Sequence, residues 1–155
     1  MIYLIHLFVG LVIGGYFHSI PLIIILAFAS HFVIDMLPHW DGPYDKAHFE
    51  KTGKLKAHKL MYFIEITDFL IVIAILIYFA DKTVFFDTKM MLGAIFSILP
   101  DVLKVGYFTP LRKNKYFMKY LQFHSKIQNE VGWKKGIFYQ LVVLAVFLIL
   151  FKTFS

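Results

Sequence analysis

Histidines and carboxylates recur in this chain at spacings that suit the binding of a metal ion. His31 and Asp35 are four positions apart, so on a helix both side chains lie on one face. Ser97 and Asp101 repeat the same spacing further along the chain. Imidazole nitrogens and carboxylate oxygens bind divalent ions, which can activate water and polarise a phosphoryl or carbonyl oxygen. The pattern therefore predicts a metal-dependent site.

The predicted metal ligands lie at matching ends of separate apolar segments. They are His6, His31, Asp35, His39 and Asp101. Pro38 is expected to end a helix just before His39, so the direction of that side chain is left open. Two further residues are predicted catalytic groups: Asp68, which could instead be a ligand or support one, and His124, as a general acid/base or a further ligand.

The chain contains no cysteine, so thiolate metal sites, disulfides and cysteine nucleophiles are excluded. A set of imidazoles and carboxylates suits Zn²⁺, and a larger share of carboxylate favours Mn²⁺ or Mg²⁺. We therefore expect a divalent metal ion as the cofactor, with Zn, Mn and Mg as the candidates.

Structural roles remain open for the same residues. His31 and Asp35 could form a hydrogen-bonded pair that joins helices, and Asp101 could cap a helix broken by the proline before it. Glu65 and Asp68 could be first-turn acids that complement a helix dipole. We favour a site because a charge inside a bilayer costs at least about 2.5 kcal/mol and normally faces a cavity or a partner.

The composition indicates a membrane protein. Of the 155 residues, 59% are hydrophobic, whereas ordinary soluble domains contain about 45–50%. The mean hydropathy is +0.70. Apolar segments near the roughly 20 residues that cross a bilayer lie at about 1–17, 21–37, 60–80, 90–108 and 136–151. We therefore predict an all-α, polytopic membrane bundle of about five transmembrane helices in a single domain, 1–155.

The connecting segments differ in length and charge. A polar loop is predicted at 39–59, a short connector at 81–88, and a basic amphipathic helix at the membrane interface over 110–133. Gly10 and Gly14 have the GxxxG spacing that permits close helix packing.

The basic residues predict the orientation of the chain. With five spans, the N-terminus, the loop 39–59 and the segment 109–135 share one side. That side holds Lys46, Lys51, Lys54, Lys56, Lys59, Arg112, Lys113, Lys115, Lys119, Lys126, Lys134 and Lys135. The other side holds only Lys82, Lys89 and Lys152. The positive-inside rule then places the N-terminus in the cytoplasm.

The net charge of +6 could indicate nucleic-acid binding. The basic residues, however, flank apolar segments and do not form a stripe on a polar domain. We expect membrane lipids as partners, with anionic headgroups near 110–135, and no nucleic acid.

The run Ser30-His31-Phe32-Val33-Ile34-Asp35, preceded by His6, resembles the bacterial membrane-bound metal-dependent hydrolase family, which includes a LexA-regulated inner-membrane protein. That family has an early His, an LPDxD segment, an HRxxTHS segment and a late SHxxxD. The match covers His6, His31 with Asp35, and the LPD that ends at Asp101, and His124-Ser125 shares the HS of HRxxTHS. Leu103 replaces the second acid of LPDxD, the Arg and Thr of HRxxTHS are missing, and SHxxxD here precedes LPD.

The resemblance implies a metal-dependent hydrolase in the cytoplasmic membrane of a bacterium or archaeon. Our leading hypothesis is a His/Asp site at the cytoplasmic membrane face that acts on a phosphoester or lipid-linked substrate. The alternatives are a metal-ion or proton transporter, which would need ionisable groups along the whole path, and a non-catalytic membrane adaptor, in which the His and Asp residues only stabilise the fold.

Overall fold

The computed structural model describes residues 1–80 and 88–154, and within them the fold is all-helical, as predicted, without a β-strand. The α-helices of this part are α1 (Tyr3–Tyr16), α2 (Ile20–Asp35), α3 (Lys46–Thr52), α4 (Lys59–Ala80), α5 (Thr88–Lys104), α6 (Lys115–Ile127) and α7 (Trp133–Phe151). Each of the five predicted apolar segments overlaps one helix, and the loop 39–59 contains the short α3. The connector predicted at 81–88 falls on 81–87, outside the described residues.

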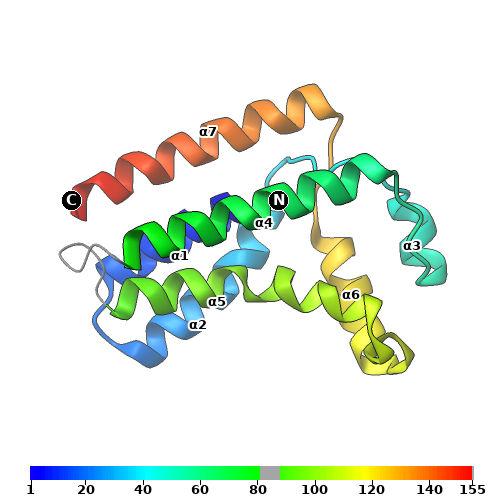
Figure 1. Ribbon diagram of the computed structural model, residues 1–155, viewed down its shortest axis with the longest axis horizontal. Coiled ribbons are helices and arrows are strands. Elements are labelled where there is room, and N and C mark those ends of the chain that lie inside the picture. The colour runs from blue at the N-terminus through cyan, green and yellow to red at the C-terminus, as the bar shows by residue number, and fades with distance from the viewer. Residues whose placement is uncertain (81–87, 155) are drawn as a thin grey trace.

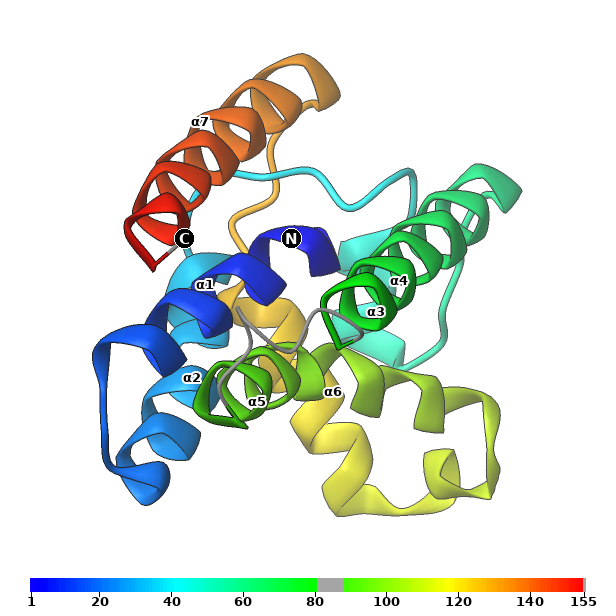
Figure 2. The same cartoon turned by 60° about the vertical axis from the view of Figure 1, so that its left-hand side comes forward.

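Helix α1 is the centre of the bundle and packs closest against α5 (Figures 1 and 2). Glycines make this approach possible: a Cβ built on Gly10 would lie 2.3 Å from the carbonyl oxygen of Gly93, and one on Gly14 would lie 2.3 Å from that of Lys89. The GxxxG spacing therefore does permit close helix packing. It brings the backbones of α1 and α5 into direct contact.

Helix α5 runs through Pro100 without ending there and continues to Lys104. Beyond it, a 3-10 helix, η1 (Val105–Phe108), extends the apolar segment. Asp101 thus lies inside a helix and does not cap a broken one. Its side chain is buried, so it points into the bundle.

Within residues 1–80 and 88–154, three helical stretches are long and apolar enough to cross a membrane: Lys59–Tyr78, Thr88–Phe108 and Trp133–Phe151. The prediction of about five spans is not confirmed, because α1 has 14 residues and α2 has 16. At 1.5 Å per residue these helices reach about 21 and 24 Å, less than the roughly 30 Å of a bilayer core.

The polypeptide that follows α6 ties this helix to the end of α2. The backbone N–H of Asn129 donates to the carbonyl oxygen of Asp35 over 3.0 Å. His39 exchanges backbone hydrogen bonds with both sides of Glu130: its N–H donates to Asn129, and its carbonyl oxygen accepts from Val131. Helix α6 is thereby held against the bundle, and one face of the predicted interfacial segment is buried.

Candidate metal centre

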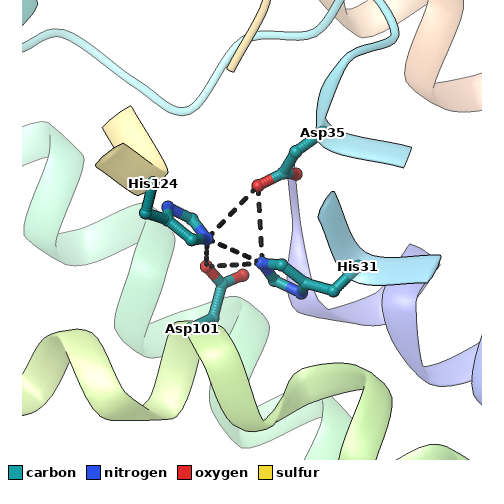
Figure 3. Close-up of side chains that lie close together, drawn as sticks. All are labelled: His31, Asp35, Asp101 and His124. Atoms are coloured by element: carbon teal, nitrogen blue, oxygen red, sulfur yellow. Dashed lines mark hydrogen bonds and ion pairs between the residues drawn. The ribbon is translucent and has the colours of Figure 1, made fainter. Parts of the chain in front are cut away.

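Four buried side chains from three helices meet at one point (Figure 3). His31 and Asp35 come from α2, Asp101 from α5 and His124 from α6. One donor atom of each lies within 4.8 Å of all the others. All four residues were predicted from the sequence as members of the site. The structure therefore places side chains that are up to 93 residues apart in one cluster, which we call the His/Asp cluster.

His31 is oriented by a backbone carbonyl. Its Nδ1 lies 2.9 Å from the carbonyl oxygen of Ser97 on α5. A carbonyl oxygen can only accept a hydrogen bond, so Nδ1 carries the proton, and in the neutral ring Nε2 keeps a free lone pair. That Nε2 faces the cluster, 3.4 Å from an oxygen of Asp35. A backbone contact of this kind is a common support of a metal-ligating histidine.

His124 completes the cluster from α6. Its Nε2 lies 2.8 Å from Nε2 of His31 and 3.5 Å from Oδ2 of Asp35. Burial, together with the nearby Lys104 ammonium, lowers the pKa of His124 to about 3. The ring is therefore neutral at pH 7 and able to offer a lone pair to a metal ion. The Tyr120 hydroxyl, which donates to the carbonyl oxygen of Pro100 over 2.9 Å, fixes this helix on α5.

Asp101 faces both imidazoles. Its Oδ1 lies 3.5 Å from Nε2 of His31 and 3.7 Å from Nε2 of His124. The Lys104 ammonium lies 2.5 Å from the same oxygen. This cation compensates the carboxylate inside the fold, which otherwise would be buried without enough partners.

His6 lies directly behind the cluster. Its Nε2 is 3.2 Å from Oδ1 of Asp35, and its ring stacks on that of His31 with the centroids 4.0 Å apart. His6 is outside the set of four whose donor atoms converge. In this position it can hold the Asp35 carboxylate and the His31 ring in their orientations through these two contacts.

His39 and Asp68, also predicted for the site, lie outside the set of four. Because α2 ends at Asp35 and Pro38 follows, His39 turns away: its Nδ1 lies 2.8 Å from the carbonyl oxygen of Leu37 and its Nε2 3.2 Å from Asp41. Asp68 is on α4 and accepts a hydrogen bond from the backbone N–H of Tyr3. Both side chains are buried, but neither supplies a donor atom to the cluster.

A polar network that the sequence analysis missed surrounds Asp35. The amine of Met1 lies 2.9 Å from Oδ1 of Asp35 and 2.9 Å from Oδ1 of Asp41. The amide of Gln128 donates to Oδ2 of Asp41 over 2.9 Å and to Oδ2 of Asp35 over 3.4 Å. No spacing in the sequence relates these residues to one another, because each comes from a different segment.

Charge compensation shifts the titration of Asp41. Burial alone would raise its pKa, but the Met1 ammonium and His39 outweigh burial and hold the pKa below the ordinary value.

Lys104, which contacts the cluster, was also missed by the sequence analysis. It has a sequence signal, since it follows Asp101 at the i, i+3 spacing of a helix.

The donor atoms of the His/Asp cluster fit a divalent ion. Two imidazole nitrogens and two carboxylates form a four-ligand set without sulfur, which suits Zn²⁺ and is compatible with Mn²⁺. Two nitrogens bound at about 2.0–2.1 Å to a tetrahedral ion lie roughly 3.3 Å apart. The 2.8 Å between the two Nε2 atoms requires only a small outward movement to reach that separation.

The comparisons with known proteins leave the family of this chain open. No family model matches the chain, and neither the curated proteins nor the solved structures include a match. The resemblance to the metal-dependent hydrolase family therefore rests on the residues quoted above.

Proposed function

We propose that this protein is a metal-dependent hydrolase of the cytoplasmic membrane, with its centre at the cytoplasmic face. One observation carries the proposal: buried donor atoms of His31, Asp35, Asp101 and His124 lie within 4.8 Å of one another. Buried ionisable groups are costly, and a convergent group of imidazoles and carboxylates is an arrangement that suits a divalent ion. The ion, when bound, supplies a Lewis acid for the hydrolysis of an ester or phosphoester.

The residues of the chain have separate roles in this proposal. His31, Asp35, Asp101 and His124 hold the ion, and His6 orients Asp35 through the 3.2 Å contact. The position of His124 favours the role of ligand over that of general acid/base. Lys104 holds Asp101 in place and adds a positive charge next to the reacting group.

The membrane orientation in this proposal follows from the charges. The N-terminal end of α1, the C-terminal ends of α2 and α5, and helix α6 all meet at the His/Asp cluster, so these parts share one side. The basic residues of 109–135 belong to that side, and the positive-inside rule makes it cytoplasmic. We propose that the same basic residues contact anionic headgroups.

A transporter would need polar groups along its whole path. The opposite half of α4, from Phe69 to Tyr78, contains no ionisable side chain except Tyr78, and the first half of α2 contains none. An apolar stretch of this kind favours a site at one face over a path through the membrane.

Metal analysis of the purified protein tests the proposal. We expect about one Zn²⁺ or Mn²⁺ per chain in the wild type, and a large loss of metal in Asp101→Asn, which keeps the shape of the side chain but removes its charge. Asp45→Asn is the matched control: Asp45 caps α3 away from the cluster, and Asn is an equally good cap. Wild-type protein that takes up none of the Zn²⁺, Mn²⁺ or Mg²⁺ offered would refute the proposal.

A further inference from the structure

A cavity of about 380 Å³ lies beside the His/Asp cluster. Its walls come from α4, from the end of α5 with η1, and from α3 and α6. Most of the lining is aliphatic or aromatic, including Met61, Phe69, Val102 and Leu121. A lining of this kind takes a hydrocarbon chain, and the volume falls in the lower part of the roughly 300–1,000 Å³ range of ligand pockets. One chain fits such a space better than two.

The inner end of the cavity is polar and touches the cluster. His124 belongs to both the lining and the cluster. Lys104 and Gln128 also line the cavity, and each contacts a carboxylate of the cluster: Lys104 pairs with Asp101, and Gln128 donates to Asp35. A molecule whose chain fills the cavity therefore has its other end at the donor atoms.

The opposite end of the cavity opens through exposed apolar side chains. Ile66 and Leu70 on α4 are 59% and 60% exposed, and Val105 and Phe108 on η1 are 58% and 63% exposed. All four belong to stretches long and apolar enough to cross a membrane. With these stretches in a bilayer, the opening faces the acyl chains, so a lipid reaches the cavity without passing through water.

The charges at the inner end select the head of that lipid. A divalent ion balances the carboxylates of Asp35 and Asp101, while the carboxylate of Asp41 pairs with the Met1 ammonium. The carboxylate of Glu65 also lines the cavity, so Lys104 is not in excess there; the ion and the Lys104 ammonium are the two cations that a phosphoryl oxygen can contact at the inner end. Such a site attracts an anionic head.

We infer that the cavity binds a lipid with a single hydrocarbon chain and places its phosphoester head at the His/Asp cluster. The inference rests on the proposed function and names the class of its substrate. Hydrolysis would break one P–O ester bond, with the hydroxyl of water added to phosphorus and its proton to the leaving oxygen.

A photoreactive single-chain lipid tests the inference on the whole protein in nanodiscs. The probe is lysophosphatidic acid with a diazirine near the end of its chain, and unlabelled lysophosphatidic acid is the competitor. We expect labelling of 62–70 and 102–108 that the competitor removes. Labelling of α7, whose apolar side chains face outward, is expected to persist as contact with bulk lipid.

Blocking variants make the test specific. Val105→Trp fills the opening and should weaken the competable labelling roughly tenfold. Val146→Trp is its control: Val146 is 49% exposed on α7 and does not line the cavity. Ile66→Trp with Ile149→Trp repeats the comparison should the first pair fold poorly. Wild-type labelling that the competitor does not remove, or folded variants at Val105 and Ile66 that label as well as the wild type, would overturn the inference.

The outcomes separate the two proposals. Competable labelling in a protein that binds no metal would leave a lipid-binding cavity and remove the hydrolase. Bound metal without competable labelling would leave the metal centre and remove the lipid substrate.

Discussion

The Nε2 atoms of His31 and His124 lie 2.8 Å apart although 93 residues separate them in the chain. The Ser97 carbonyl oxygen turns the first ring, and the attachment of α6 to the end of α2 brings in the second. Two nitrogens at this distance need either a shared proton or a shared cation between them. The same contact therefore identifies the two imidazoles at which to test for a bound cation.

Removal of His6 should weaken the site without abolishing it. His6 contacts Asp35 and stacks on His31 but lies outside the set of four donors. His6→Gln is expected to lower metal affinity by about 10–100-fold, as for other residues that support ligands from behind. Competition with a chelator measures the change. His18→Gln, at an exposed position in a turn, should leave the affinity unchanged; equal affinities in the two variants would contradict this role.

Lys104 should matter most when the metal is absent. Without its ammonium, the buried carboxylate of Asp101 loses a partner at 2.5 Å. We expect Lys104→Met to destabilise the metal-free protein by about 1–3 kcal/mol, and metal to restore much of the loss because the ion takes over the compensation. Thermal unfolding in detergent, with and without Zn²⁺, gives both values. Lys119→Met, at an exposed position, is the control. A loss of stability in Lys104→Met that metal leaves unchanged would count against Asp101 as a carboxylate that both Lys104 and the ion compensate.

The contact of α1 with α5 should tolerate no side chain at Gly10. A Cβ there would meet the backbone at 2.3 Å, whereas a Cβ on Gly132 has no neighbour within 4 Å. Gly10→Ala is therefore expected to destabilise the protein by about 1–3 kcal/mol or more, and Gly132→Ala by much less. Their unfolding midpoints can be compared in one detergent. Similar midpoints would mean that α1 and α5 are not in direct contact.

The lowered pKa of Asp41 predicts how the stability of the fold depends on pH. Its pKa is held below the ordinary value in the folded protein, so its contribution is complete above about pH 3.9 and is lost as pH falls through the lower folded value. Asp41→Asn, which leaves the Met1 amine without its second carboxylate, should cost about 3–5 kcal/mol at neutral pH. The difference in the free energy of unfolding between wild type and variant should stay constant from pH 7 to about pH 5 and shrink below about pH 4. A gap that closes already between pH 7 and pH 5 would rule out a lowered pKa.

The periodicity of apolar segments was sufficient to predict an all-helical fold and the positions of the main helices, because lipid-facing and core-facing residues are both apolar over long runs. It did not show whether α1 and α2 cross the membrane. Pro21 is the second residue of α2 and Pro38 lies just beyond its end, yet the 16 residues of α2 fall short of a full span. Hydropathy alone does not distinguish a short apolar helix from a membrane-crossing one.

The members of the cluster were predictable from residue type and spacing, since His31 and Asp35 share one face of α2 and Asp101 is an acid inside the apolar α5. The residues that surround the cluster in space were not predictable. Gln128 approaches Asp35 because the segment after α6 pairs with the backbone around His39, and such a non-local contact has no sequence period. Lys104 could have been found from its i, i+3 relation to Asp101.

The most direct test of the account is X-ray absorption spectroscopy at the Zn or Mn edge of the metal-loaded protein. We predict two imidazole nitrogens and carboxylate oxygens at about 2.0–2.2 Å from the ion, with one imidazole lost in His124→Ala and one in His31→Ala. A spectrum without imidazole scattering, or one that neither substitution changes, would contradict a metal centre built from His31, Asp35, Asp101 and His124.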